Sequence, residues 1–258
     1  MPVNTLITGA SSGIGEALAV ACAKRGDTLF LCGRDGHRLG LVAERCRAAL
    51  SAQGGGEVRA EIVDVTDEYA VRSWIERCDS NAPLDRVFAN AGVSTGEETE
   101  RNVRATFATN VGGCVNTVLP ALEIFRRRGA SDGGNRQIVI TASIAAYGPL
   151  GACPSYAATK ACVKSWGLSL RSMYARSGVK VNVVCPGFVR SRITDANTCP
   201  MPFFLEADQA AETILRGVDR NRGLIAFPWQ MRLSAWLLSV LPWRVNELAN
   251  RLLPRKSR

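Results

Sequence analysis

The chain has 258 residues and a net charge of +9, with 47% hydrophobic and 21% charged residues, which excludes a disordered or fibrous protein. This length is typical of one large domain with a full hydrophobic core. The nine cysteines include no Cys-x-x-Cys pair, so a disulfide framework or zinc ribbon is disfavoured and we expect reduced thiols in a cytoplasmic protein. The single histidine, His37, leaves His-based metal centres without ligands, and we expect no metal site.

The positive charge is concentrated near the C-terminal end. Between Arg220 and Arg258, eight basic residues stand against one acid, Glu247, so seven of the nine net charges lie in the last 39 residues. Because no recognised nucleic-acid-binding motif accompanies this basic segment, we expect no nucleic-acid partner.

Short apolar runs alternate with helix-length segments from the first residues to about residue 227. The expected strands are Val3–Thr8, Thr28–Cys32, Glu57–Val63, Asp85–Ala89, Gln137–Thr141, Val179–Cys185 and Leu224–Phe227. The expected helices are Ile14–Arg25, His37–Ala52, Glu68–Arg77, Asn102–Arg128, Tyr156–Ser177 and Glu206–Arg220. The strands lack period-two alternation, which is typical of strands buried on both faces. The alternation predicts a doubly wound, Rossmann-type parallel sheet, an α/β fold in one domain over residues 1–227. Since its first strand begins at Val3, we expect no signal peptide.

Three glycines follow the first expected strand, in the run Thr8-Gly9-Ala10-Ser11-Ser12-Gly13-Ile14-Gly15. Glycines allow a sharp turn and a close approach of the backbone, and the helix that follows offers unpaired N–H groups to a pyrophosphate. The spacing differs from the common G-x-G-x-x-G pattern, so a simple tight turn is the alternative. The place between the first strand and the first helix favours a phosphate site.

The same run matches the G-x-S-x-G pattern of a nucleophile elbow, with Ser11 as the attacking group. A hydrolase of that kind needs a histidine base late in the chain. Because His37 is the only histidine and comes early, the sequence disfavours this interpretation.

Tyr156 and Lys160 are four residues apart in an expected helix and therefore lie on the same side of it. A phenol titrates near 10, so acting at neutral pH requires a shift of about three units, or roughly 4 kcal/mol. We expect a nearby cation and a cofactor charge to lower the pKa of Tyr156. Ser143, thirteen residues upstream, follows the fifth strand and can reach the same reacting oxygen. The alternative is an ordinary helix with a half-buried tyrosine and an extended lysine.

Together these motifs resemble the classical short-chain dehydrogenase/reductase family, over residues 3 to about 227. Thr8–Gly15 resembles its cofactor loop. The further matches are Asp64-Val65, Asn90-Ala91-Gly92, Asn110, Ser143, Tyr156, Lys160 and Pro186-Gly187. Six motifs in the right order on the right elements make the resemblance specific.

The resemblance implies an NAD(P)-dependent oxidoreductase that transfers a hydride between a nicotinamide and a carbonyl or alcohol substrate. It implies that Tyr156 is the general acid in reduction, that Lys160 lowers its pKa and holds the nicotinamide ribose, and that Ser143 polarises the substrate oxygen. Asn110 would hold a water on the proton path from Lys160, and Asn90 would brace the sheet edge. The alternative is a non-catalytic cofactor sensor on the same fold, but such proteins tend to lose the tyrosine or the lysine.

The residues at the end of the second expected strand determine whether NAD or NADP is preferred. Family members that prefer NAD usually have an acid there, whereas this chain has Gly33 followed by Arg34. A guanidinium can bind a 2′-phosphate, so we predict that NADP(H) is preferred over NAD(H). The alternative is that Arg34 is only a surface residue that caps the strand. The expected cofactor-binding residues are Gly9, Ser11, Ser12, Gly13, Ile14, Gly15, Arg34, Asp64, Val65, Asn90, Ala91, Gly92, Tyr156, Lys160, Pro186, Gly187, Val189 and Ser191.

The segments after the sixth strand concern the substrate and partners. Arg192–Leu205 resembles the family's mobile lid, and its apolar residues indicate either an apolar substrate or simple exclusion of water. The basic extension 228–258, rich in Trp and Leu, predicts amphipathic helices that contact a membrane surface or, alternatively, pack on a neighbouring subunit or over the substrate cleft. Its apolar run is too short to span a bilayer. The resemblance also implies a homodimer or homotetramer formed by Asn102–Arg128 and Tyr156–Ser177.

Overall fold

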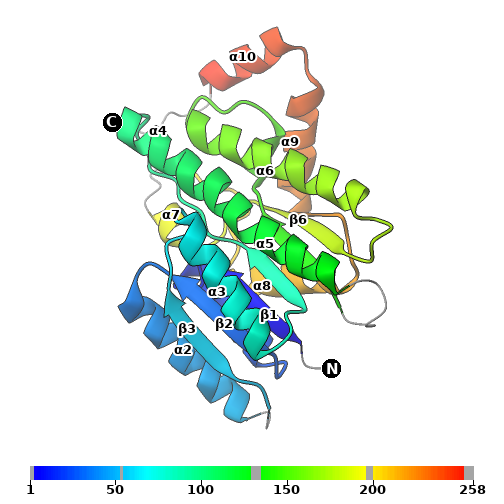
Figure 1. Ribbon diagram of the computed structural model, residues 1–258. Coiled ribbons are helices and arrows are strands. Elements are labelled where there is room, and N and C mark those ends of the chain that lie inside the picture. The colour runs from blue at the N-terminus through cyan, green and yellow to red at the C-terminus, as the bar shows by residue number, and fades with distance from the viewer. Residues whose placement is uncertain (1–2, 53–54, 129–134, 196–199, 253–258) are drawn as a thin grey trace.

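The computed structural model describes residues 3–52, 55–128, 135–195 and 200–252, and its centre is a parallel β-sheet (Figure 1). The strands are β1 Asn4–Thr8, β2 Thr28–Gly33, β3 Val58–Ile62, β4 Arg86–Ala89, β5 Gln137–Thr141, β6 Lys180–Pro186 and β7 Leu224–Phe227. Their order is β3-β2-β1-β4-β5-β6-β7, with every neighbouring pair parallel. The chain builds outward from β1 on one side and from β4 on the other, so a crevice opens between these strands at their carboxyl ends.

Helices cover both faces of the sheet. The α-helices are α1 Gly13–Ala23, α2 Gly36–Ser51, α3 Glu68–Asn81, α4 Glu100–Phe107, α5 Gly113–Arg127, α6 Pro154–Met173, α7 Arg192–Asp195, α8 Ala207–Asp219, α9 Trp229–Val240 and α10 Trp243–Leu252. A π-helix, η1 Ala108–Gly112, joins α4 to α5, and a 3₁₀ turn, η2 Ile144–Tyr147, precedes α6. One face carries α1, α2 and α8, and the other carries α3, α5 and α6.

Two apolar cores lie on the two faces of the sheet. Successive strand residues point to opposite faces, so Leu6 belongs to the core under α3 and α5, whereas Ile7 belongs to the core under α1 and α8. Both side chains are fully buried. Burial on both faces explains why the central strands read as continuous apolar runs.

The edge strand β3 departs from the expectation. Four of its five residues are exposed, and Ile62 is 67% exposed, so the prediction of burial on both faces is wrong for this strand. The physical reason is its position, because β3 pairs only with β2. Charged residues such as Arg59 and Glu61 suit such an edge, since they discourage pairing with another chain.

The long helix expected over Asn102–Arg128 is interrupted. It is built of α4, η1 and α5, and the π-helical turn inserts at Asn110. A π-turn widens the helix locally and is frequent at functional sites. The interruption lies in the segment that contains a predicted site residue.

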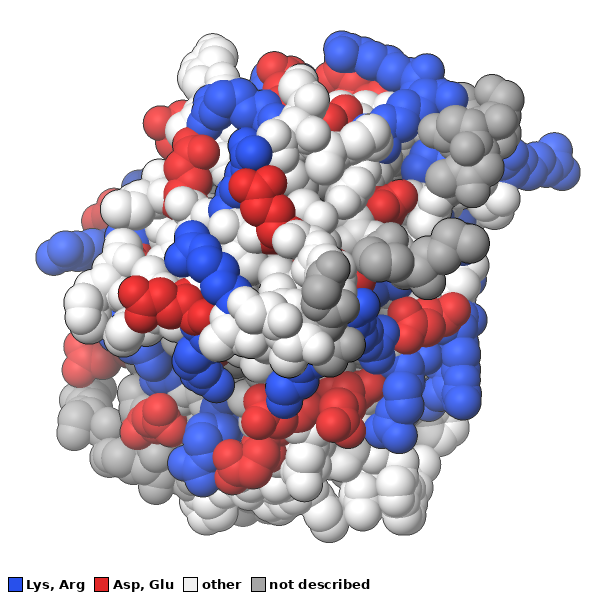
Figure 2. Space-filling view, turned by 90° about the horizontal axis from the view of Figure 1, so that it is seen from below, with Lys and Arg blue, Asp and Glu red and all other residues white. Residues whose placement is uncertain are grey.

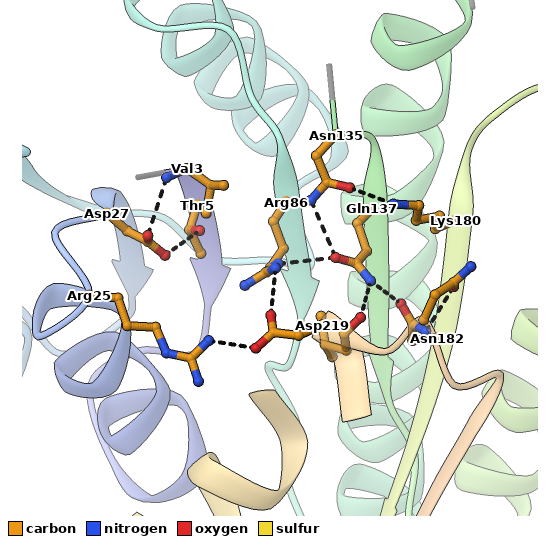
Figure 3. Close-up of polar contacts among 12 residues, drawn as sticks. Val3, Thr5, Arg25, Asp27, Arg86, Asn135, Gln137, Lys180, Asn182 and Asp219 are labelled. Carbon is orange, nitrogen blue, oxygen red and sulfur yellow. Dashed lines mark hydrogen bonds and ion pairs between the residues drawn. The ribbon is translucent and has the colours of Figure 1, made fainter. Parts of the chain in front are cut away.

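A buried polar network ties the amino ends of the strands to α8, at the end of the sheet opposite the crevice (Figure 3). Arg86 of β4 is 5% exposed and donates to Asp219 at 3.1 Å and to Gln137 of β5 at 3.2 Å. Gln137 in turn donates to Asn182 of β6 at 2.8 Å, and Arg25 pairs with Asp219 at 2.8 Å. The network satisfies the buried guanidinium, as a charge out of water requires.

The C-terminal extension forms α9 and α10 beyond β7 (Figure 1). On α9, Met231 and Ala235 pack against the core under α3, α5 and α6. Asn250 of α10 accepts a hydrogen bond from the backbone N–H of Gly151 at 3.0 Å. Within the described ranges, every helix is too short or too polar to cross a bilayer.

Candidate active site

A cavity of about 460 Å³ lies at the carboxyl ends of β1, β4 and β5, in the crevice that the strand order creates. The glycine loop lines one part of it, and Ser143, Tyr156 and Lys160 line another. Three residues of the sheet edge, Thr141, Gly187 and Val65, complete the wall between these parts. The structure therefore brings the expected loop and the expected reactive side chains to one cavity.

The glycine loop leaves no space for side chains. Gly9 and Gly13 have φ angles of +67° and +59°, which glycine adopts at low cost. A Cβ on Gly9 would lie 2.7 Å from the Cα of Ala91, and one on Gly13 would lie 2.8 Å from the Cβ of Ser191. At Gly15 a Cβ would collide with the carbonyl oxygen of Gly9. These close approaches explain the glycines at all three positions.

The loop leads directly into α1, whose first turn faces the cavity. Ser12 is the N-cap residue, and its side chain makes no capping hydrogen bond. The first N–H groups of α1 therefore lack a side-chain acceptor, and together with the helix dipole they favour an anion. Ser11, Ser12 and Ile14 line the same part of the cavity. The residues present fit the pyrophosphate of a dinucleotide.

Asn90 braces the strand ends beside the loop. Its Nδ2 donates to the carbonyl oxygen of Thr8 at 3.2 Å and to that of Gly9 at 3.4 Å, and its Oδ1 accepts from Thr141 at 3.3 Å. Its backbone N–H donates to Thr8 Oγ1 at 3.1 Å. This geometry agrees with the expected bracing of the sheet edge. Ala91 and Gly92, which follow Asn90, also line the cavity.

Ser143, Tyr156 and Lys160 come together from two elements. Ser143 is the N-cap of η2, and its hydroxyl accepts from the N–H of Ala145 at 3.1 Å and lies close enough to the Tyr156 phenol to lower its pKa. Tyr156 and Lys160 lie one turn apart on α6, and Lys160 Nζ is 5.8 Å from the Tyr156 ring centroid. Nζ donates to the carbonyl oxygen of Thr141 at 2.9 Å.

Burial controls the titration of both groups. It raises the pKa of Tyr156 to about 12, against a smaller lowering by the neighbouring Ser143 hydroxyl. It lowers the pKa of Lys160 to about 8, because the 4%-exposed ammonium is removed from water. The expected lowering of the Tyr156 pKa is therefore reversed in the protein alone. The physical reason is that desolvation disfavours the phenolate, while the ammonium is directed at the Thr141 carbonyl.

Asn110 lies behind the reactive group rather than on the cavity wall. Its side chain accepts from the backbone N–H of Val93 at 2.8 Å and donates to the Val93 carbonyl at 3.0 Å and to Thr159 Oγ1 at 3.0 Å. A Cβ on Gly92 would lie 3.1 Å from Lys160 Nζ and 3.2 Å from Asn110 Oδ1. Asn110 therefore sits next to the lysine and is fully occupied by protein partners that join η1, α6 and the loop after β4.

Basic residues gather where the second strand ends. Arg34, Arg38 and Arg192 line this part of the cavity. Arg34 is 58% exposed and lies 3.8 Å from the carboxylate of Asp64. The Nε of Arg38 is buried and has no hydrogen-bond partner. An anionic group in this part of the cavity would meet these cations.

Asp64 and Val65 behave differently from each other. Val65 lines the cavity, whereas the Asp64 carboxylate accepts from both the N–H and the hydroxyl of Thr66 at 2.9 Å and faces Arg34. Of the expected cofactor-binding pair Asp64-Val65, the valine is thus on the wall and the aspartate lies beside it.

The turn after β6 closes the far side of the cavity. Pro186, Gly187, Val189 and Ser191 all line it, as the sequence predicts. The backbone N–H of Ser191 donates to Thr194 Oγ1 at 2.8 Å, so the loop is tied to α7. Part of the expected lid, residues 196–199, lies outside the described residues.

Several wall residues escaped the sequence analysis. The most informative is Arg38, which follows Arg34 by four residues. This spacing of two arginines at the start of a helix could have indicated that both line the same part of the cavity. Arg192 and Thr194 reach the wall because α7 folds back on the glycine loop, and no local pattern indicates this. Val93, Ser94 and Thr95 follow the expected N-A-G motif and could have been included by continuity.

A doubly wound parallel sheet with a glycine-lined helix start at its crevice defines a dinucleotide-binding α/β protein. The family model for short chain dehydrogenases matches residues 4–200. An uncharacterized oxidoreductase of Myxococcus xanthus is 35% identical to this chain over 258 residues, and the match covers 97% of each of the two proteins. The structure of a Sphingobium yanoikuyae short-chain dehydrogenase in complex with NADPH is similar, with a TM-score of 0.78 and 25% sequence identity. The match covers all of this chain and 98% of that one. A Burkholderia phymatum enzyme in complex with NAD has the same coverage, with TM-score 0.79 and 23% identity.

The chain belongs to the short-chain dehydrogenase/reductase family. It is accordingly an NAD(P)-dependent oxidoreductase that acts on a CH–OH or C=O group. Its similarity to solved structures with either nicotinamide cofactor leaves the choice between NADP and NAD to be argued from its own residues.

Proposed function

We propose that the protein is an NADPH-dependent reductase of a small-molecule carbonyl, with Tyr156 as the proton donor. One observation carries this proposal: Ser143, Tyr156 and the buried Lys160 line the same cavity as the glycine loop. When bound, the nicotinamide supplies the hydride that the carbonyl carbon receives. The protein then has to bind the substrate oxygen and deliver one proton to it.

Tyr156 donates that proton. Because its pKa is raised to about 12, the phenol remains protonated throughout the neutral range and is ready as an acid. Ser143, which lines the cavity with Tyr156, donates to the same substrate oxygen and stabilises the negative charge that develops there. Both groups are held on the cavity wall by η2 and α6, so little reorganisation is needed.

Lys160 returns a proton to the phenolate and stabilises it. Its ammonium has a pKa of about 8, closer to neutrality than a free lysine, so it can release a proton at moderate cost. Asn110 supports the lysine from behind, because its side chain fixes Val93 and Thr159 around Gly92. We assign Asn110 a positioning role, with a water on the Lys160 side as the expected continuation of the proton path.

A preference for NADP(H) follows from charge at the end of β2. Gly33 stands where an acid would select NAD and Arg34 follows it, and the Nε of Arg38, which has no hydrogen-bond partner, lies nearby. Asp35 pairs with Arg38 at 2.9 Å and Asp64 lies 3.8 Å from Arg34, so two carboxylates stand against the three arginines that line this part of the cavity. The net field is therefore favourable to a 2′-phosphate.

We extend the proposal to the domain limits, the oligomeric state and the location of the protein. Residues 1–227 would form the cofactor-binding unit, and 228–258 an extension that starts where β7 ends. Membership of this family supports subunit contact through α5 and α6, in a homodimer or homotetramer. We expect a cytoplasmic location.

An NADPH-oxidation screen tests the function. The intact protein is assayed with a panel of carbonyl compounds that includes apolar, acyl-chain and nucleotide-sugar ketones, each with NADPH and with NADH. We expect turnover with at least one class and faster turnover with NADPH. Absence of turnover across the panel, in protein that binds NADPH, would favour a cofactor sensor and overturn the proposal.

A further inference from the structure

The outer side of α9 carries an apolar surface that nothing in the described chain covers. Its five members are between 47% and 69% exposed: Trp229, Leu233, Trp236, Leu237 and Val240. We call these residues the outer face of α9. On α10, Trp243 and Leu248 add side chains that are 70% and 59% exposed. Elsewhere in the described ranges, large exposed apolar side chains occur singly on separate elements, as is normal for a soluble surface.

The spacing shows that this face is a helical stripe. Positions 229, 233, 236, 237 and 240 fall within about 100° around the helix axis. The opposite side of α9 presents Met231 and Ala235 to the core. A helix that is apolar on both sides requires a partner on both, and the described residues supply only the inner one.

Charge discriminates between the candidate partners. Five net positive charges lie in the sequence of residues 228–258, and among the described ion pairs none involves Arg232 or Arg244. In contrast, acidic and basic side chains are interspersed on the face seen in Figure 2, which is viewed from the end opposite α10. Two copies meeting through this extension would bring like charges together. An anionic surface would instead be attracted to it.

We propose that the outer face of α9, continued by the exposed apolar residues of α10, docks on an anionic lipid bilayer. Tryptophan favours the boundary between headgroups and acyl chains, where an apolar ring and a polar N–H are both accommodated. Arginines such as Arg232 and Arg244 can keep their charge among the headgroups while their stems lie along the apolar surface. The helix lies in the plane of the interface rather than across it, in agreement with its length.

This docking places the bilayer beside the rim of the cavity. Gly187 lines the cavity, and a Cβ on it would lie 2.6 Å from the sulfur of Met231, on the inner side of α9. Asn250 of α10 holds Gly151, in the loop that precedes Tyr156 on α6. The extension therefore contacts the cavity wall at Gly187 and the loop before α6 at Gly151, and is not a detached arm.

Flotation with vesicles tests the proposal on the full-length protein. We expect co-flotation with vesicles of phosphatidylcholine mixed with phosphatidylglycerol, weakening as salt is added, and little with phosphatidylcholine alone. The variant W236S/L237S, which removes two side chains of the outer face, is expected to bind at least about tenfold more weakly. On vesicle binding, tryptophan emission should shift to the blue, because Trp74 and Trp166 are partly or fully buried already and the other three are exposed.

The matched control is L41S/Y69S, which removes two exposed apolar residues from α2 and α3. It should float like the unmodified protein. Circular dichroism and NADPH affinity check that both variants are folded, and neither readout depends on turnover, so failure of the proposed reaction would leave this test intact.

Failure of the intact protein to float with the anionic vesicles overturns the proposal, as does equal binding by W236S/L237S. If sedimentation shows that W236S/L237S dissociates an oligomer while the intact protein ignores vesicles, the face belongs between two copies of the chain and the lipid assignment is wrong.

Discussion

Of the two titratable residues proposed to move the proton, Lys160 is the one whose charge state changes closer to neutral pH. Burial brings its pKa to about 8, while the pKa of Tyr156 rises to about 12. The ammonium is thus present below pH 8 and lost above it, whereas the phenol keeps its proton through the same interval. The pH dependence of reduction therefore reports on the lysine and not on the tyrosine.

We expect kcat/KM for carbonyl reduction to be level near neutral pH and to fall with an apparent pKa of about 8. Loss of the ammonium removes both the proton source and the charge that stabilises the phenolate. In Lys160→Arg the cation persists to higher pH, so the falling limb should disappear from whatever activity remains. Lys164→Met is the control and should retain the limb, because this lysine lies over the Tyr147 ring instead. A profile of the unmodified enzyme that stays level to about pH 10 would contradict this account.

Arg34 is the residue on which the cofactor preference depends most. Arg34→Ala removes the guanidinium that faces the expected 2′-phosphate and should cut the NADPH/NADH ratio of kcat/KM by about 10- to 100-fold, mainly through KM for NADPH. Steady-state kinetics with both cofactors measures this ratio. Arg104→Ala, which removes an exposed arginine on α4, should leave it unchanged. A preference for NADH in the unmodified enzyme would remove the claim.

At the scale of elements, the turn from β1 into α1 determines whether a dinucleotide can bind. Gly15→Ala introduces a Cβ that collides with the carbonyl oxygen of Gly9 and approaches Asn90 Nδ2 within 2.6 Å, so the loop must shift. We expect NADPH affinity, measured by fluorescence titration, to fall by at least about tenfold. In Gly40→Ala, a control within α2, nothing lies within 4 Å of the new Cβ, and stability should rise by about 0.5–1 kcal/mol with unchanged affinity. Unchanged affinity in Gly15→Ala would show that the loop is not the phosphate site.

The elements also show which features the sequence predicts well. β5 and β7 match their expected limits, since apolar runs bounded by polar residues are local signals. The interruption of the long helix at η1 and the exposure of β3 were missed. Both depend on tertiary context, the first on the contacts of Asn110 with Val93 and Thr159, and the second on edge position in the sheet.

The features of the candidate site also divide into those that the sequence predicts and those that depend on tertiary structure. Ser143, Tyr156, Lys160 and the glycines were located because chemistry and spacing are both visible in the sequence. Arg192 reaches the cavity only through folding back of α7, and the direction of the Tyr156 pKa shift depends on burial that spacing does not reveal.

At the scale of the whole molecule, stability and chemistry are concentrated at opposite ends of the sheet. Asp219 joins α8 to the buried Arg86 and to Arg25 at the amino ends of the strands (Figure 3). Asp219→Ala leaves the 5%-exposed guanidinium of Arg86 without its carboxylate and should cost about 2–4 kcal/mol, less than a fully buried pair because Asp219 is partly exposed. Urea unfolding measures this loss, and NADPH affinity should not change. Glu100→Ala, which breaks an exposed pair with Arg104, should cost less than about 0.5 kcal/mol. An equal loss in both variants would show that the network is not specially stabilising.

The most direct measurement compares NADPH binding with turnover in Tyr156→Phe. The variant removes one oxygen from the cavity wall, so NADPH affinity should stay within about twofold while reduction falls by about 10³-fold. Tyr147→Phe is the matched control, because the Tyr147 hydroxyl is buried without a hydrogen-bond partner and has no assigned part in proton transfer. Turnover by Tyr156→Phe at the rate of the unmodified enzyme would contradict the account.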